Sequence, residues 1–221
     1  GPMTAAIFKH SGDMNAVANP HPDLCNPSAW VLEATSPPGY SRAEYQAPRL
    51  PTLDHAYIYT WREFIPEDFF TGIDLAWMLR SQWKTWPCGS SQPIDVADEL
   101  CGGGGIFNEF EIDGHMGIFD FRTRPDCRRV QLPTHEFLGQ WSTYVLEIHW
   151  TTSSDGYYRI FRNGRLLAQE SGIKTLYDGF VEGECDISFA TGLYDEWYTV
   201  DGGDRDLLRA YFDDHAIFDM D

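Results

Sequence analysis

The feature that most constrains the fold of this chain is an alternation of side chains with a period of two, repeated in short segments. In residues 186–198, the side chains of Ile187, Phe189 and Leu193 fall on one face, and residues 144–150 alternate in the same way. This is the pattern of β-strands, whose successive side chains point to opposite faces. Helical periodicity is confined to residues 203–210. We therefore predict an all-β fold.

Length and composition favour one folded unit. The chain has 221 residues, of which 43% are hydrophobic, a size at which β-sandwiches commonly form a single domain. Gly1-Pro2 ahead of Met3 matches the remnant that a protease leaves after removing an expression tag. We therefore take residues 3–221 as the domain. No apolar run approaches the roughly 20 residues that a membrane span requires, so we expect no membrane association.

The charge balance restricts the partners of the chain. The sequence contains 34 acidic and 16 basic residues, for a formal net charge of -18, whereas a nucleic-acid partner would require a basic face. We expect no nucleic-acid partner and a secreted or extracellular monomer. Several cations lie in the N-terminal half and could still attract an anionic ligand locally. These are Arg42, Arg49, Arg62, Arg80 and Lys84.

The five cysteines are odd in number and lack the CxxC spacing of zinc sites. Cys88 and Cys101 bracket a loop that a disulfide could close. Free thiols in the core or under loops are the alternative, and at least one cysteine has no partner within the chain.

Alternation in the N-terminal half places polar or aromatic side chains in rows. One row consists of Arg42, Glu44 and Gln46, which would also suit a surface ladder at a sheet edge. A second row consists of His55, Tyr57, Tyr59 and Trp61 and could form a wall on which sugars stack. A third row consists of Arg80, Gln82, Lys84 and Trp86, and such a polar row rarely forms a dry core.

Short pieces of the sequence resemble strands of polysaccharide lyases. Residues 189–196, Phe-Ala-Thr-Gly-Leu-Tyr-Asp-Glu, resemble the Phe-Lys-Ala-Gly-x-Tyr-Asn-Gln strand of alginate lyases. Residues 42–46 resemble their Arg-x-Glu-x-Arg strand, with Gln46 replacing the final arginine. Residues 82–84 resemble their Gln-x-His element, with Lys84 in place of histidine, and the Gln-Trp-Lys strand of glucuronan-lyase-like and heparin-lyase-like proteins. Residues 141–169 and 210–218 resemble concanavalin-like sandwiches.

The resemblance implies a concanavalin A-like β-jelly roll of two antiparallel sheets and a lyase that cleaves a uronic-acid-containing polysaccharide, such as glucuronan, by β-elimination. An amide and cations would neutralise the carboxylate while a tyrosine or histidine transfers protons. We assign Tyr194, His55 and Gln82 to catalysis. We assign Arg42, Lys84, Arg80, Tyr59, Trp86 and Tyr198 to substrate binding. One concave sheet should carry Arg42, His55, Gln82, Lys84 and Tyr194 on its open face.

Other functions remain open at this stage. Residues 111–115 resemble the Glu-x-Asp-x-x-Glu strand of jelly-roll glycoside hydrolases, in which Glu111 and Asp113 would act, although His115 stands near the place of the second glutamate. A non-catalytic, lectin-like carbohydrate-binding module would use the many aromatic residues for stacking. We expect no cofactor for catalysis and assign no metal ligands. A structural calcium could bind at Asp201, Asp204 and Asp206, or at Asp213 and Asp214.

Overall fold

The computed structural model describes residues 6–10, 13–23, 26–37, 41–50, 52–69, 73–75, 77–86, 106–113, 116–121, 128–176, 180–195, 198–200 and 208–220. Every strand pair among these residues is antiparallel, and the strands form two seven-stranded sheets and a small two-stranded one. The predicted two-sheet, all-β architecture is therefore confirmed.

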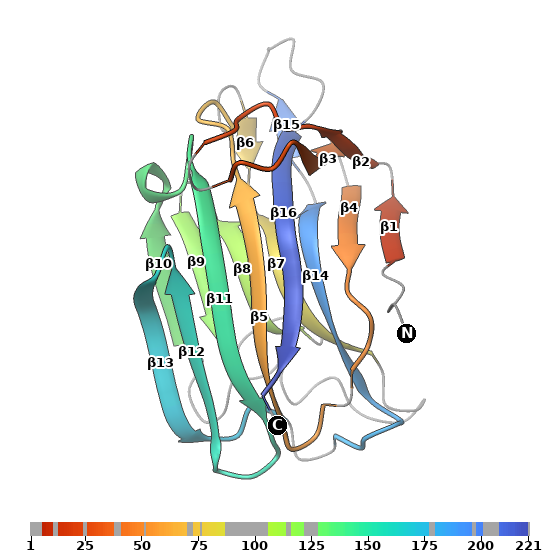
Figure 1. The fold of residues 1–221 in the computed structure, drawn as a ribbon, viewed down its shortest axis with the longest axis vertical. Coiled ribbons are helices and arrows are strands. Elements are labelled where there is room, and N and C mark those ends of the chain that lie inside the picture. The colour runs from red at the N-terminus through yellow and green to blue at the C-terminus, as the bar shows by residue number, and fades with distance from the viewer. Residues whose placement is uncertain are drawn as a thin grey trace.

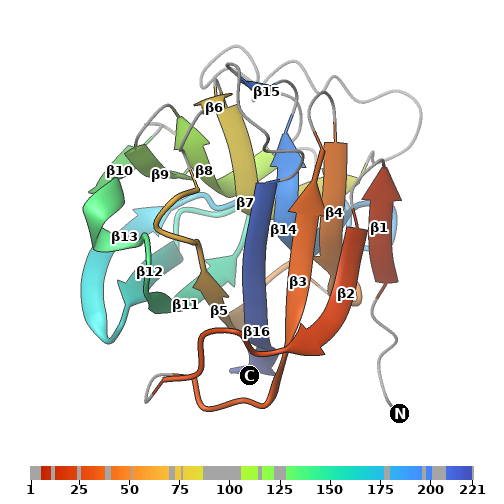
Figure 2. The same ribbon diagram turned by 90° about the horizontal axis from the view of Figure 1, so that it is seen from above.

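The β14 sheet contains, in spatial order, β1 (Ala6–His10), β4 (Ser41–Gln46), β14 (Asp186–Asp195), β7 (Trp77–Trp86), β8 (Ile106–Asp113), β9 (Met116–Phe121) and β10 (Arg128–Pro133). The β5 sheet contains β13 (Arg165–Ile173), β12 (Gly156–Arg162), β11 (Trp141–Trp150), β5 (His55–Phe64), β16 (Leu208–Asp219), β3 (Trp30–Ser36) and β2 (Asp13–Ala18). The small sheet pairs β6 (Ile73–Leu75) with β15 (Tyr198–Val200). Figures 1 and 2 show the two large sheets stacked as layers.

The local sequence accounts for a tight turn, whereas one prediction of helix was wrong. Asn163 and Gly164 both have positive φ, 48° and 75°, as a tight hairpin turn between β12 and β13 requires. A short 3-10 helix, η2 (Thr134–Glu136), precedes β11. Helical periodicity at residues 203–210 predicted a turn of helix, but β16 already begins at Leu208.

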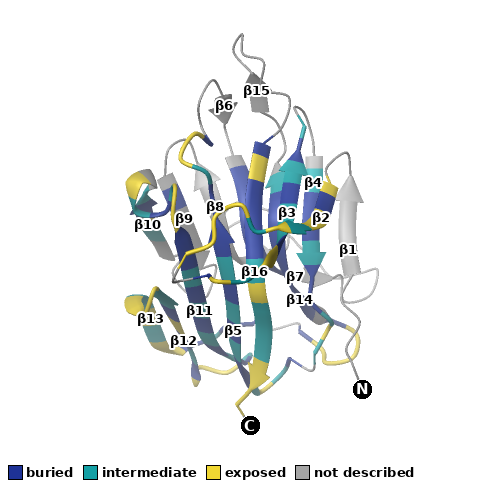
Figure 3. Ribbon diagram, turned by 45° about the horizontal axis from the view of Figure 1, so that its top comes forward, coloured by how far each residue is buried: buried dark blue, intermediate teal, exposed yellow. Residues whose placement is uncertain are grey.

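The core is an aromatic layer between the two large sheets. Trp61 of β5 lies with its ring centroid 5.5 Å from that of Trp83 on β7. Phe189 of β14 stacks on Trp83 at 4.7 Å and meets Tyr59 of β5 at 5.3 Å. These four aromatic residues are buried, and Figure 3 shows buried residues along β5 and β11. Large aromatic rings supply much of the apolar area that holds such a sandwich together.

Strand β7 carries a β-bulge at Arg80. On β8, Glu111 pairs with Leu79 and the adjacent Phe110 pairs with Ser81, so Arg80 is an extra residue in β7. A bulge resets the alternation of side chains along its strand. Met78 and Trp83 consequently both pack in the core, although five positions apart in an uninterrupted strand they would face opposite sides.

Strand β14 is irregular at the same level. Residues 192–193 lie opposite Arg80, because Thr191 pairs with Ser81 and Tyr194 with Leu79. Gly192 has a φ of +150°, and a Cβ atom there would lie 2.1 Å from the backbone oxygen of Ala43. Only glycine allows β14 to approach β4 so closely.

One cysteine can be placed. Cys185, just before β14, is buried and disulfide-bonded. Cys88 and Cys101, which we considered as a pair, lie outside the described residues, as do Cys25 and Cys127.

Candidate active site

The register of three neighbouring strands brings predicted site residues together on the outer face of the β14 sheet. Arg42 on β4 pairs with Tyr194 on β14. Four residues before Tyr194 on the same strand, Ala190 pairs with Gln46 on one side and with Gln82 of β7 on the other. Paired residues of neighbouring strands share a face. The expected common face is therefore confirmed for Arg42, Gln82 and Tyr194.

Glu44 links the two strands that flank β14. Its carboxylate accepts a hydrogen bond from Gln82 Nε2 and another from Arg42 Nε. The Glu44 side chain is 1% exposed and Gln82 is fully buried. Charge-assisted hydrogen bonds of this kind are stronger than neutral ones, so the three side chains form one connected unit.

Small residues on β14 make this link possible. Glu44 and Gln82 belong to strands that do not pair with each other, and β14 lies between them. Neighbouring strands are roughly 4.8 Å apart, so the two side chains must meet above the middle strand. The outer face of β14 carries Ala190 and Gly192 at this point, and neither residue blocks the path.

Tyr194 completes the cluster, which we call the Glu44 cluster and define as Arg42, Glu44, Gln82 and Tyr194. The guanidinium carbon of Arg42 lies 5.1 Å from the centre of the Tyr194 ring, within the range of a cation–π contact. The cluster thus joins a phenol, a carboxylate, an amide and a guanidinium on one partly covered face.

Three other predicted binding residues can be placed by their backbone alone. Lys84 pairs with Ser188 and Trp86 with Asp186, both on β14. Tyr198 lies in β15 and pairs with Leu75. The side chains of Lys84, Trp86 and Tyr198 lie outside the described ones, and their roles stay predictions.

The prediction that His55 shares this face is wrong. His55 lies at the start of β5, which belongs to the other sheet. Tyr59, in the same row, is 4% exposed, and its hydroxyl accepts a hydrogen bond from Trp150 Nε1 in the core. Alternation correctly grouped the row of His55, Tyr57, Tyr59 and Trp61, but this row faces the inside of the sandwich. Burial accordingly raises the pKa of Tyr59 well above its usual range.

The prediction that Arg80 lies beside Gln82 is also wrong. The β-bulge turns Arg80 to the inner face, where its Nη1 lies 2.9 Å from Glu63 Oε1 of β5. Its guanidinium carbon lies 4.6 Å from the centre of the Phe137 ring. Arg80 therefore bridges the two sheets and does not reach the outer face.

Other expected cations are also engaged in ion pairs. Arg62 Nη1 lies 3.0 Å from Asp214 Oδ2 on the β5 sheet, and Arg42 is bonded to Glu44. Ion pairing reduces the charge that these groups present to a ligand. The local attraction of an anionic ligand by these cations, expected from the sequence, stays a prediction.

The residues named in the alternative hypotheses are only partly described. Glu111 pairs with Leu79, and Asp113 pairs with Trp77 and Met116, but their side chains lie outside the described ones. His115 lies outside the described residues, as do the three aspartates of residues 201–206. Within the described part of the chain, no group of three or more His, Cys, Asp or Glu side chains could hold a metal ion.

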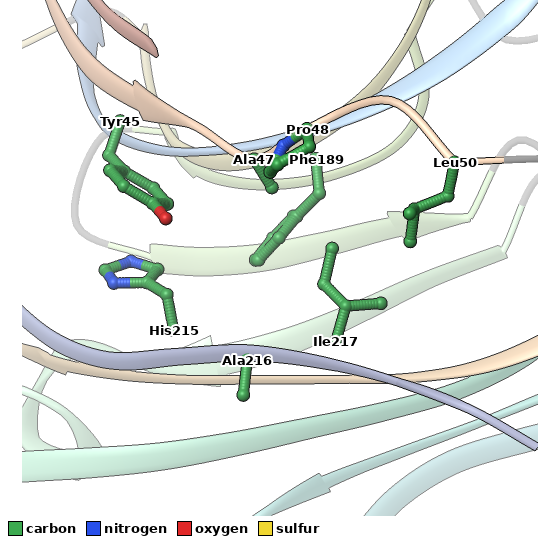
Figure 4. Close-up of a pocket in the computed structure, with 8 residues that line it drawn as sticks. All are labelled: Tyr45, Ala47, Pro48, Leu50, Phe189, His215, Ala216 and Ile217. Atoms are coloured by element: carbon green, nitrogen blue, oxygen red, sulfur yellow. The ribbon is translucent and has the colours of Figure 1, made fainter. Parts of the chain in front are cut away.

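A cavity of about 170 Å³ lies on the other side of β4, between the sheets (Figure 4). It is lined by Tyr45, Ala47, Pro48, Leu50, Phe189, His215, Ala216 and Ile217. The His215 ring lies 4.8 Å from that of Tyr45, and its Nε2 contacts the hydroxyl of Thr191. Burial lowers the pKa of His215 to about 4, so the ring is neutral at neutral pH.

The sequence matches the polysaccharide lyase family over residues 9–216. The chain belongs to this family. Its assignment as an enzyme, a polysaccharide lyase, is thereby confirmed, and its substrate is a polysaccharide. A search of curated proteins gave no match. Among the described residues, no helix has the length and apolar character needed to cross a bilayer.

Solved structures show the same jelly-roll fold. An endo-β-1,4-glucuronan lyase from the fungus Trichoderma reesei is 19% identical, with a TM-score of 0.68 over 96% of this chain and 89% of that one. The alginate lyase AlyC3 is 10% identical, with a TM-score of 0.55 over 86% and 75%. An alginate lyase from Corynebacterium sp. is 10% identical, with a TM-score of 0.54 over 86% and 77%. The predicted jelly roll is confirmed.

Sequence reasoning did not assign Glu44 to the site, although it placed Glu44 on the face of Arg42. The sequence could not reveal this role, because Glu44 contacts Gln82, which lies 38 positions away in the sequence. A glutamate two positions after an arginine on a strand suggests an ion pair, but gives no indication of a partner on a distant strand.

Proposed function

We propose that this chain cleaves a glucuronate-containing polyuronate by β-elimination at the Glu44 cluster. The observation that carries the proposal is the connected set of Arg42, Glu44, Gln82 and Tyr194 on one face of the β14 sheet. Family membership supports the reaction class, and the likeness to a glucuronan lyase over 96% of the chain supports the choice of polymer.

The reaction requires two kinds of group. β-Elimination removes the hydrogen on the carbon beside the uronate carboxylate, forms a carbon–carbon double bond, and expels the glycosidic oxygen, which takes up a proton. The carbon acid is weak, so charge that develops on the carboxylate must be stabilised. A group that transfers protons must lie on the same face.

The cluster offers both kinds of group. Gln82 and Arg42 supply the amide and guanidinium donors that would hold the substrate carboxylate. Tyr194 supplies the phenolic hydroxyl that would transfer protons, and the guanidinium carbon of Arg42 lies 5.1 Å from the centre of its ring. With His55 on the other sheet, proton transfer in this proposal rests on Tyr194.

The proposal extends to the setting of the enzyme. The net charge of -18 suits a protein that works outside the cell as a monomer. The proposed chemistry uses protein side chains and needs no cofactor, while structural calcium stays an untested prediction. Size-exclusion chromatography, and activity assays with and without a chelator, would test these two points.

A polymer screen tests the reaction. Glucuronan, alginate, ulvan and a heparin-type polymer are each incubated with the enzyme, and ultraviolet absorbance and reducing ends are followed together. Elimination produces an unsaturated uronate that absorbs, so both signals should rise in parallel on a glucuronate-containing polymer.

Two results would contradict the proposal. Reducing ends without absorbance would indicate hydrolysis, and the loss of that activity in Glu111→Gln would place it on β8. Binding of a polymer with neither signal would indicate a lectin-like module.

A further inference from the structure

Glu44 is a buried carboxylate whose two oxygens both serve neighbouring site residues. Oε1 accepts the hydrogen bond from Gln82 Nε2, and Oε2 accepts the one from Arg42 Nε. Burial of a carboxylate is unfavourable unless hydrogen bonds compensate it. Strand pairing does not require such a residue here, because Glu44 already pairs through its backbone with Gly192 and Phe8.

The carboxylate determines which way the Gln82 amide points. An ionised carboxylate only accepts hydrogen bonds, so it selects the NH₂ end of the amide. Gln82 Oε1 is then directed elsewhere, and it is buried without a hydrogen-bond partner among the described residues. A buried acceptor without a partner is unfavourable, so the Glu44 carboxylate holds the amide in an orientation that the amide oxygen alone would not favour.

We propose that Glu44 is a positioning residue of this enzyme. It fixes the Gln82 amide with its NH₂ end toward the carboxylate, and it orients the Arg42 guanidinium beside Tyr194. The inference rests on the proposed function, because it names the residue that positions Gln82 and Arg42 in the same site.

The first test replaces Glu44 by glutamine, which keeps the shape and removes the charge. An amide at position 44 can present either end to Gln82, so the orientation is no longer fixed. We expect kcat on the glucuronate polymer to fall by about 10²-fold, the effect of a small misplacement in an active site. KM should not rise, because Arg42 loses its competing partner. Glu147→Gln is the control, because Glu147 pairs with exposed Arg159 on the other sheet.

Two readouts separate positioning from a structural role. Removing the Glu44 carboxylate leaves the positive charge of Arg42 less neutralised beside Tyr194, which favours the phenolate, so the pH–rate profile of Glu44→Gln should move to lower pH. In a Gln82→Ala background, Glu44→Gln should lower kcat by a smaller factor than in the wild type, because part of the effect of Glu44 passes through Gln82. If Glu44 had only a structural role, the pH–rate profile would not move. The decrease in kcat of the double variant would then be the product of the decreases in the two single variants.

A second variant covers the case in which Glu44→Gln does not fold. Glu44→Asp keeps the charge but is one methylene too short to reach both partners, and it should show the same loss of kcat to a smaller extent. The inference is overturned if folded Glu44→Gln or Glu44→Asp keeps wild-type kcat, or if the losses multiply in the double variant.

A readout independent of turnover distinguishes this inference from the proposed function. The side-chain amide resonances of Gln82 should shift in whichever of the two Glu44 variants is folded, and stay in place in Glu147→Gln. If the wild type produces no unsaturated product from any polymer, the proposed function fails. If the Gln82 resonances do not shift when Glu44 is substituted, the inference fails, regardless of the activity that the variant shows.

Discussion

Arg80 Nη1 lies 2.9 Å from Glu63 Oε1, and this ion pair joins β7 of one sheet to β5 of the other. The two side chains are 0% and 1% exposed. Burial raises the pKa of Glu63, and the positive charge of Arg80 opposes that rise. Removing one member of such a pair leaves an uncompensated buried charge, which is far more unfavourable than losing an exposed pair.

We expect Arg80→Met to lower the free energy of unfolding by about 3–5 kcal/mol, measured by urea denaturation. The double variant Arg80→Met/Glu63→Met should recover much of this loss, because neither member of the buried pair is left without the other. Arg159→Met is the matched control, since its exposed pair with Glu147 at 3.3 Å contributes at most about 1 kcal/mol. Equal losses in Arg80→Met and Arg159→Met would contradict the interpretation.

Gly192→Ala should lower both stability and activity. A Cβ atom at Gly192 would lie 2.1 Å from a backbone oxygen and 2.7 Å from the Cα atom of Glu44, so β14 would have to move away from β4. Gly183→Ala is the control, because Gly183 also has a positive φ, +82°, but has open space around it. Gly183→Ala should lower the free energy of unfolding by about 1–2 kcal/mol, and Gly192→Ala should lower it by clearly more. Similar melting temperatures for the two variants would show that close packing is unimportant.

Tyr194→Phe should abolish most of the lyase activity and preserve the fold. The substitution removes only the phenolic oxygen and keeps the ring beside Arg42. Loss of a general acid or base reduces the rate by roughly 10²–10⁴-fold. The measurement is the initial rate of ultraviolet absorbance on the best polymer, with circular dichroism as the check on folding. Near-full activity would remove Tyr194 from the proposed chemistry.

His215 should make the native state less stable as the pH falls from about 6.5 to about 4. Its pKa in the folded chain is about 4, against an ordinary value of 6.5. The unfolded chain therefore binds a proton in this window before the native chain does, and protonation favours unfolding. In His215→Gln, stability measured across this window should depend less steeply on pH. His135→Gln, at an exposed position, should keep the wild-type slope, and an unchanged slope in His215→Gln would count against the assignment.

Added salt should weaken the binding of an anionic polymer. A polyuronate approaches a protein with a net charge of -18, so productive binding requires local cations whose attraction salt screens. We expect KM to rise with ionic strength while kcat changes less. Initial rates at several salt concentrations measure both parameters. A KM that ignores salt would indicate that electrostatic attraction contributes little to binding.

The sequence allowed the fold and part of the site to be predicted because alternation is a local property. The spacing of Arg42, Glu44 and Gln46 predicted one face, and the structure confirms Arg42 and Glu44 as neighbours there. Alternation does not tell whether a row faces the core or the outside. The row containing Tyr57 and Tyr59 is therefore a core row, although the polar ends of its aromatic side chains suggested sugar binding.

The remaining errors have geometric causes. The bulge at Arg80 is specified by pairing with neighbouring strands, which a single strand sequence does not reveal. The contact between Glu44 and Gln82 depends on the order of the strands in the sheet. The bulge and the contact could be recognised only from the tertiary structure. Both determine which side chains belong to the site.

The bulge in β7 also affects how this protein can be compared with its relatives. A homologue that lacks one residue near Arg80 would keep the same core and the same site. An alignment without a gap would nevertheless be shifted by one residue on one side of the bulge. There, core residues of the homologue would be matched to site residues of this chain. Equivalence in this strand therefore has to be established separately for the segments before and after Arg80. Grafting the Gln82 segment onto another jelly roll would likewise require the extra residue to be carried with it.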